Sequence, residues 1–173
     1  MCFRITTFLF VILLPLAIFA QTKTAAAKYI GYEYVGVIPD GTLPNGIKSL
    51  GGGLIGDINA DPVYEIAQMK KGTESMLWFN VSTGKDSTGV TGWKVLDVLT
   101  FPALRRSDYL FFYGDPAIEC RRGGKDIPNL VGVGTIVRRQ GSFKPSRLWT
   151  ANLSTKKFEP VQIAGVKCVY SEP

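Results

Sequence analysis

The sequence contains no histidine, and carboxylates are the groups we weigh for acid–base catalysis. The absence of histidine excludes Ser-His-Asp and Cys-His nucleophilic sites, histidine-ligated zinc and an imidazole base. Two carboxylates can still hydrolyse a glycosidic bond when they lie on either side of it. The candidates near expected strand ends are Asp97, Asp108, Asp115 and Glu119. Acids at strand ends are usually solvated, so a carboxylate-dependent glycan hydrolase is an alternative prediction and not the first.

Basic residues are the second group with a chemical role, and they are concentrated in the C-terminal half. The chain has 20 Lys and Arg against 14 Asp and Glu, for a net charge of +6. Cations interleaved with aromatic residues can bind polyanions, including acidic glycans, anionic surfaces and single-stranded nucleic acid. The modest charge argues against specific nucleic-acid binding. The predicted binding residues are Arg121, Arg122, Lys125, Arg138 and Arg139.

A glycine-rich segment matches the G-x-G-x-x-G pattern at residues 51–56. That pattern binds a pyrophosphate only between a strand and a helix, and the Asp57–Pro62 segment that follows cannot open a helix. We therefore predict a long Gly/Pro-rich loop over residues 38–62. Asp57, Asn59 and Asp61 also have the spacing of a calcium loop, but Pro62 replaces the glycine that an EF-hand needs. Ordinary turn chemistry is the prediction, with a weak calcium site as the alternative and no metal or cofactor expected.

The N-terminus has the three parts of a secretory signal peptide. Arg4 precedes an apolar run over residues 8–19, and Ala20 closes it before a polar segment. We predict a signal peptide over residues 1–20, a flexible lead-in over 21–28, and a secreted or periplasmic protein without a transmembrane helix after processing. An uncleaved anchor is the alternative. In an oxidising compartment Cys120 and Cys168 can pair as a disulfide, and two buried thiols remain the other possibility.

Short runs of β-branched and aromatic residues, separated by Gly, Pro, Asn and Asp, dominate the rest of the chain. They predict an all-β domain over residues 29–173, built as an antiparallel sandwich or a partly open barrel of nine or ten short strands. Segments 103–108 and 126–130 could each hold a helical turn. The expected strands cover residues 29–37, 63–69, 75–81, 93–101, 109–113, 118–122, 130–137, 147–152, 158–163 and 166–170.

Two segments carry a resemblance to a group of proteins. Residues 93–99 read W-x-V-L-D-V-L, and residues 149–168 contain W-x-x-N-x-x-T-x-K-F followed by G-V-x-C. Over residues 63–170 the chain resembles small exported bacterial proteins of unassigned function with these segments. The resemblance implies a cell-envelope or secreted domain with a disulfide between Cys120 and Cys168. It implies no activity and no functional residues.

These observations together favour a non-catalytic binding or envelope-associated module that uses its basic C-terminal half. The expected partner is a polyanion or an envelope protein. The alternatives are the glycan hydrolase with Asp97, Asp115 and Glu119, and a purely structural envelope subunit. Glycosylation sequons begin at Asn80 and Asn152, both in or beside expected strands, which are poor acceptor positions.

Overall fold

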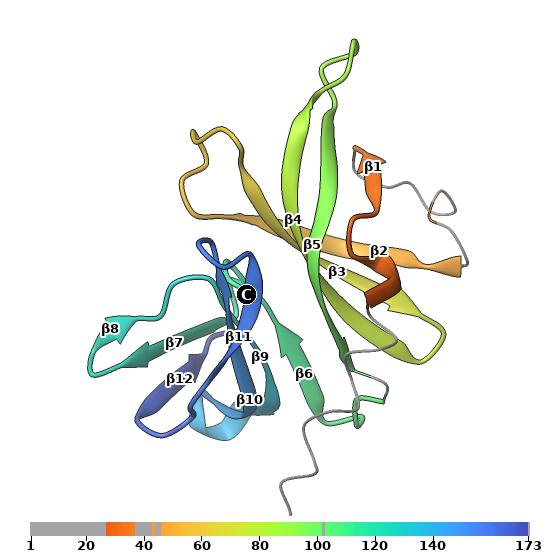
Figure 1. The fold of residues 1–173 in the computed structure, drawn as a ribbon. Helices are drawn as coiled ribbons and strands as arrows, with labels where there is room; N and C mark the ends of the chain where they lie inside the picture. The colour runs from red at the N-terminus through yellow and green to blue at the C-terminus, as the bar shows by residue number, and fades with distance from the viewer. Residues whose placement is uncertain (1–26, 37–42, 44–45, 102, 173) are drawn as a thin grey trace, which may run out of the picture.

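The computed structural model describes residues 27–36, 43, 46–101 and 103–172, and β-strands dominate it (Figure 1). The described strands form two antiparallel sheets, which confirms the predicted all-β antiparallel class. The predicted signal peptide and residues 21–26 of the predicted lead-in lie outside the described residues. No helix in the described part of the chain has the length and apolar character needed to cross a bilayer.

The first sheet contains five strands in the order β1-β5-β4-β3-β2. Its longest hairpins join β3 to β4 and β4 to β5, and Gly72 provides the left-handed residue (φ 57°) in the first of these turns. Glycine adopts that conformation without the steric cost that other residues incur. The strands are β1 (Glu33–Val35), β2 (Lys48–Ile55), β3 (Tyr64–Lys71), β4 (Glu74–Lys85) and β5 (Thr91–Phe101).

The second sheet has the order β6-β9-β10-β12-β7-β8, and β11 pairs with β10 beside this path. A short 3-10 turn, η3 (Arg138–Gln140), connects β9 to β10. The strands are β6 (Asp108–Phe111), β7 (Ile118–Arg122), β8 (Lys125–Asp126), β9 (Leu130–Val137), β10 (Ser142–Asn152), β11 (Lys157–Val161) and β12 (Val166–Tyr170).

Several sequence predictions about local structure are wrong. The predicted loop over 38–62 contains strand β2, because the Gly51–Gly53 run pairs with β3 along the edge of the first sheet. A Cβ on Gly52 would lie 2.7 Å from the carbonyl oxygen of Ile66, so glycine permits this close strand approach. Segment 103–108 is irregular, and 126–130 continues from β8 without a helical turn. The described 3-10 turns are η1 (Ala27–Tyr29) and η3.

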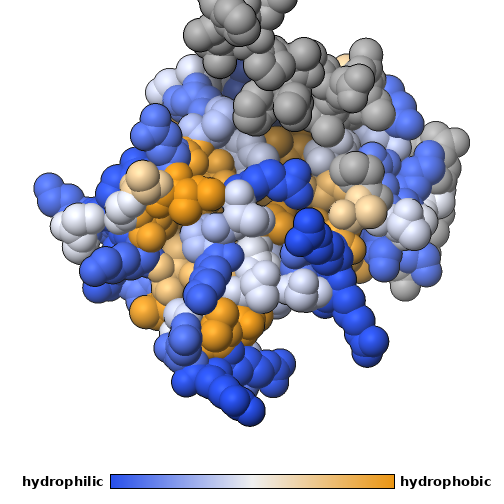
Figure 2. Space-filling model, turned by 90° about the horizontal axis from the view of Figure 1, so that it is seen from below, coloured by the Kyte–Doolittle hydropathy of each residue, from blue (hydrophilic) through white to orange (hydrophobic). Residues whose placement is uncertain are grey.

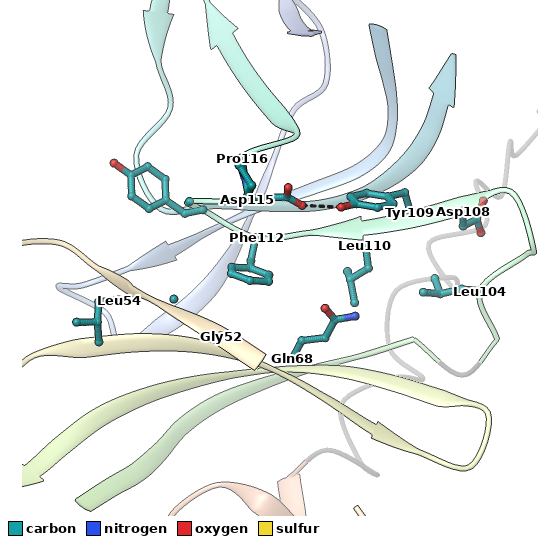
Figure 3. Close-up of a pocket in the computed structure, with 13 residues that line it drawn as sticks. Gly52, Leu54, Gln68, Leu104, Asp108, Tyr109, Leu110, Phe112, Asp115 and Pro116 are labelled. Atoms are coloured by element: carbon teal, nitrogen blue, oxygen red, sulfur yellow. Dashed lines mark hydrogen bonds between the residues drawn. The ribbon is translucent and has the colours of Figure 1, made fainter. Parts of the chain in front are cut away.

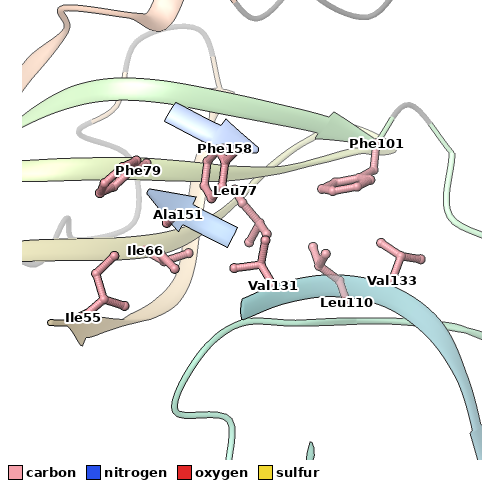
Figure 4. Packing of buried hydrophobic residues seen from close by; sticks show 10 residues of the cluster. All are labelled: Ile55, Ile66, Leu77, Phe79, Phe101, Leu110, Val131, Val133, Ala151 and Phe158. Atoms are coloured by element: carbon pink, nitrogen blue, oxygen red, sulfur yellow. The ribbon is translucent and has the colours of Figure 1, made fainter. Parts of the chain in front are cut away.

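The inter-sheet core joins the two sheets into a sandwich (Figure 4). Phe79 and Phe101 from the first sheet meet Val131 and Val133 from β9, and all four are 1% exposed or less. Phe158 on β11 packs against Phe79 with ring centroids 5.7 Å apart. Alternate residues of each strand point into this layer, which is the period-2 burial expected of a sandwich.

Each sheet also buries its other face. Trp78, Met69 and Met76 lie on the outer face of the first sheet, under Tyr29 and Ile47 from the N-terminal segment. The second sheet curls, because Phe111 on β6 and Cys120 on β7 belong to one buried cluster although three strands separate β6 from β7 in the sheet. Its buried members are Phe111, Ala117, Ile118, Cys120, Leu130, Phe143, Leu148 and Cys168.

A disulfide joins Cys120 on β7 to Cys168 on β12, as the sequence predicted. The two cysteines are direct cross-strand partners, and both are more than nine-tenths buried. Phe143 on β10 is the partner of Cys168 on its other side. The bond therefore ties the C-terminal strand to β7, its neighbour toward the β8 edge of the second sheet.

Candidate functional site

Each of the carboxylates predicted for catalysis contacts a different part of the protein. Asp97 on β5 accepts a hydrogen bond from the backbone N–H of Phe158 on β11 at 2.8 Å, which links the two sheets. Asp115 accepts from the Tyr109 hydroxyl at 3.0 Å and from a backbone N–H two residues ahead at 2.9 Å. Glu119 forms an exposed ion pair with Arg121.

Asp115 and Glu119 nevertheless line one small cavity of about 310 Å³ next to the disulfide. Asp126 contributes a third carboxylate to its lining, and the rest is mainly apolar. Asp97 is not among the residues that line this cavity. The three predicted catalytic carboxylates are thus not brought together at one place.

The predicted binding residues fall into two separate groups. Arg121, Arg122 and Lys125 lie on the β7–β8 hairpin. Arg121 pairs there with Glu119 and with Asp126, whose Oδ1 lies 2.9 Å from its Nε. The neighbouring Arg122 donates a hydrogen bond to a backbone carbonyl. Two of the three cations on this hairpin are therefore already engaged within the protein.

Arg138 and Arg139 lie instead on η3, at the opposite end of the second sheet from the β7–β8 turn. Strand register brings further cations to that end of the sandwich, where β5 finishes and β6 begins (Figure 1). We call this group the basic end, and it consists of Lys70, Lys71, Arg105, Arg106, Arg138, Arg139, Lys144 and Arg147.

The pairing of strands explains why these residues meet. Lys70 is the cross-strand partner of Ser75, which in turn pairs with Phe101 at the end of β5. Arg105 and Arg106 follow within five residues of Phe101. Figure 2 views the molecule from this side, where hydrophilic side chains project around patches of hydrophobic surface. Separate parts of the sequence thus supply one surface.

Arg147 is the best-defined member of the basic end. Its guanidinium carbon lies 5.3 Å from the centre of the Phe101 ring and 5.8 Å from that of Trp149. The two rings contact each other edge to face at 5.6 Å. Stacking on aromatic faces holds an arginine in place while leaving its outer N–H groups available to an anion. In the described residues, Arg147 has no acidic partner within ion-pair distance.

Acidic residues only partly offset the charge of the basic end. Glu172 pairs with Arg138, with 3.4 Å between the carboxylate oxygen and the guanidinium nitrogen. Asp108 accepts a hydrogen bond from the backbone N–H of Arg105 at 2.9 Å. Glu74 lies opposite Lys71 in the β3–β4 hairpin. Basic residues therefore outnumber acidic ones at this end of the sandwich.

A groove of about 770 Å³ between the two sheets opens beside the basic end (Figure 3). We call it the inter-sheet groove. Gln68 on β3 and the glycines of β2 form one wall of it, and Tyr109 and Phe112 from the β6 segment form the other. Lys70 lies two residues beyond Gln68 and so on the same face of β3. Leu104 and Asp108, which flank Arg105 and Arg106, also belong to the lining.

Two features shape the chemistry of the inter-sheet groove. A Cβ on Gly53 would lie 3.3 Å from the Phe112 ring, so the glycine keeps that side of the groove open. Burial raises the pKa of the Tyr109 hydroxyl to about 12, and the hydrogen bond to Asp115 and the charge of that carboxylate act in the same direction. The hydroxyl therefore stays protonated and holds the Asp115 carboxylate at the rim.

The remaining sequence motifs have structural roles. Asn80 is completely buried in the first sheet. The side-chain amide of Asn152 donates a hydrogen bond to Glu159 and accepts one from the backbone N–H of Ser154. Neither sequon therefore presents an available acceptor. Asp57 accepts the backbone N–H of Asn59 at 2.9 Å, which confirms turn chemistry. Among the residues described, no cluster of three or more potential metal ligands occurs.

Sequence reasoning missed part of the basic end. The arginine pairs at 105–106 and 138–139 can be read from the sequence. The strand register that brings Lys70 and Arg147 to the same end of the sandwich cannot. A cation flanked by strand aromatics, as at Arg147 beside Trp149, is the available signal in the sequence. Comparison of the chain with protein-family models, curated proteins and solved structures returned no match.

Proposed function

We propose that this protein is an exported, non-catalytic binding module for an acidic polysaccharide. The observation that carries the proposal is the inter-sheet groove, because two residues of its lining, Leu104 and Asp108, flank Arg105 and Arg106. Uronate or sulfate groups would contact Arg105, Arg106 and Arg147. Sugar rings would enter the groove against Tyr109 and Phe112.

The lining of the groove suits a glycan better than a bare anionic surface. Sugar hydroxyls need amide and carboxylate partners, and Gln68, Asp108 and Asp115 supply them. Sugar rings have apolar faces that pack on aromatic side chains, and Phe112 and Tyr109 offer such surfaces. A flat membrane would contact only the protruding cations and leave the groove unused.

The state of the carboxylates supports binding without catalysis. A glycosidase needs an acid and a second carboxylate on either side of the scissile bond. Asp97 holds a β11 backbone amide, and Glu119 is paired with Arg121. We therefore expect no reducing ends when the protein is incubated with polygalacturonate. Release of sugar that the Asp115→Asn and Glu119→Gln variants lose would instead establish the hydrolase alternative.

The binding test compares dextran sulfate with dextran, which share a backbone and differ in charge. We expect retention of the protein on dextran sulfate and on polygalacturonate at low salt, but not on dextran. The Arg105→Glu/Arg106→Glu variant should weaken binding more than tenfold. The matched control is Arg121→Glu/Arg122→Glu, which makes the same change in net charge on the β7–β8 hairpin.

The outcomes separate the competing interpretations. Equal loss in both variants would indicate a response to net charge alone and contradict the proposed site. Loss only in the hairpin variant would place binding where the sequence first predicted it. Tighter binding to phosphatidylglycerol vesicles than to either acidic polymer would favour a membrane surface. A Gln68→Ala variant that binds like the parent would remove the groove from the proposal.

A further inference from the structure

A second pocket, of about 430 Å³, lies on the face of the first sheet that points away from the second sheet. Its walls come from β1, β2, β3 and the start of β5. Ala67, Met69 and Trp93 give it an apolar side. Tyr34 and Glu65 give it a polar side, and Glu65 is the acidic residue that lines it.

Glu65 is held in this pocket by a half-buried hydrogen-bond network that includes the fully buried Asn80. The Asn80 side-chain N–H₂ donates to Glu65 Oε2 at 3.0 Å and to the Tyr34 hydroxyl oxygen at 2.7 Å. The Tyr34 hydroxyl in turn lies 3.4 Å from Glu65 Oε2. Both donors converge on one carboxylate oxygen. The second oxygen, Oε1, points toward β2, where a Cβ on Gly52 would lie 3.2 Å away.

No cation among the described residues forms an ion pair with Glu65. Lys94, which lies on β5 two strands away from β3, pairs with Glu33 at 3.1 Å. Burial raises the pKa of the Glu65 carboxyl above its usual range, although the hydrogen bonds from Asn80 and Tyr34 oppose this effect. An anion that is withdrawn from water without a counter-charge is costly, and a cation bound beside it would offset that cost.

We propose that this pocket binds an organic cation, namely an aliphatic ammonium or guanidinium group on a short apolar stem. The cation would contact Glu65, where the Tyr34 and Trp93 rings add attraction through their faces. The stem would lie against Met69 and Ala67. The pocket volume falls within the range of small-ligand sites. This site differs from the proposed polysaccharide site in charge, in ligand and in the face of the sheet.

The test is a titration of ¹⁵N-labelled protein with n-butylammonium and n-butylguanidinium, followed by amide and indole chemical shifts. We expect saturable shifts at the Trp93 indole and at the Gly51 amide, because both residues line this pocket and neither lines the inter-sheet groove. n-Butanol, which has the same stem without the charge, should leave these signals in place. Nα-acetyl-lysine methylamide distinguishes the source of the cation: binding indicates a peptide side chain, and its failure while n-butylammonium binds indicates a free amine.

Glu65→Gln is the decisive variant, because it removes the charge while keeping the size and an acceptor oxygen. We expect binding of n-butylammonium to weaken tenfold or more. Glu74→Gln is the matched control in the same hairpin, outside the pocket, and should bind like the parent. Should Glu65→Gln lose its dispersed spectrum, Trp93→Leu takes its place with the same expected loss.

The proposal is overturned if the pocket signals do not saturate, if n-butanol reproduces the shifts, or if Glu65→Gln binds as tightly as the parent. These outcomes are independent of the acidic-polysaccharide proposal. The Arg105→Glu/Arg106→Glu variant should keep full affinity for n-butylammonium, since it leaves the pocket unchanged.

Discussion

Removal of the disulfide should cost this protein a large part of its stability. Cys120 and Cys168 are 48 residues apart in the chain. In the chain-entropy treatment, closing a loop of that length restricts the unfolded state by about 4 kcal/mol, as an upper value. A domain of this size is typically stable by roughly 5–15 kcal/mol. The Cys120→Ala/Cys168→Ala variant should therefore unfold at a temperature lower by about 10 °C.

The assay is urea unfolding followed by tryptophan fluorescence, with and without reductant. Alanine is chosen because both cysteines are buried, and serine would add unpaired hydroxyls to the interior. The parent protein in reductant should reach the same stability as the double variant. A difference below about 1 kcal/mol between oxidised parent and variant would refute the reasoning, since it would mean that the bond does not restrict the unfolded chain as the loop length requires.

Three further predictions follow from single contacts. Asp97→Ala should destabilise the protein by about 1.5–3 kcal/mol in urea unfolding, because it removes a charged acceptor from a β11 amide; Asp97→Asn, which keeps an acceptor oxygen, should cost less, and equal losses would contradict this role. Gly134→Ala should prevent native pairing of β9 with β10, because its Cβ would lie 2.2 Å from a backbone oxygen of β10; Gly165→Ala, whose Cβ would meet open space and whose only cost is the left-handed φ of 77°, should cost about 1–2 kcal/mol, and a soluble, fully stable Gly134→Ala protein would oppose the argument. The Tyr109 hydroxyl should ionise near pH 12 in an ultraviolet titration; Asp115→Asn should lower this pKa because it removes the adjacent negative charge, and an unchanged value would show that Asp115 does not contribute.

Three strands of the C-terminal half were predicted to the residue: the expected ranges 118–122, 130–137 and 166–170 coincide with β7, β9 and β12. The expected strand 147–152 covers only the second part of β10 (Ser142–Asn152). Gly123 follows β7 and Gly165 precedes β12, so turn chemistry marks one end of each of these strands. The disulfide partners were also foreseen, since only two cysteines remain outside the predicted signal peptide.

Strand β2 could not be predicted, because its three consecutive glycines have low strand propensity. The tertiary structure overrides that tendency at Gly52, where the approach of β3 leaves no room for a side chain. The same contact opens space for the Glu65 carboxylate on one face. The Glu65 network shares this origin: Tyr34, Glu65 and Asn80 are distant in sequence, and only the strand order brings them together.

The sequence by itself determined the charge of this protein, its lack of imidazole chemistry and its β-rich class, because these properties follow from residue types and local patterns. Only the tertiary structure decided which cations share a surface. Arg121 and Arg122 are engaged by an acid and by a backbone carbonyl, whereas Arg147 lies over the Phe101 and Trp149 rings. Strand register depends on long-range pairing, and that pairing sets these distances.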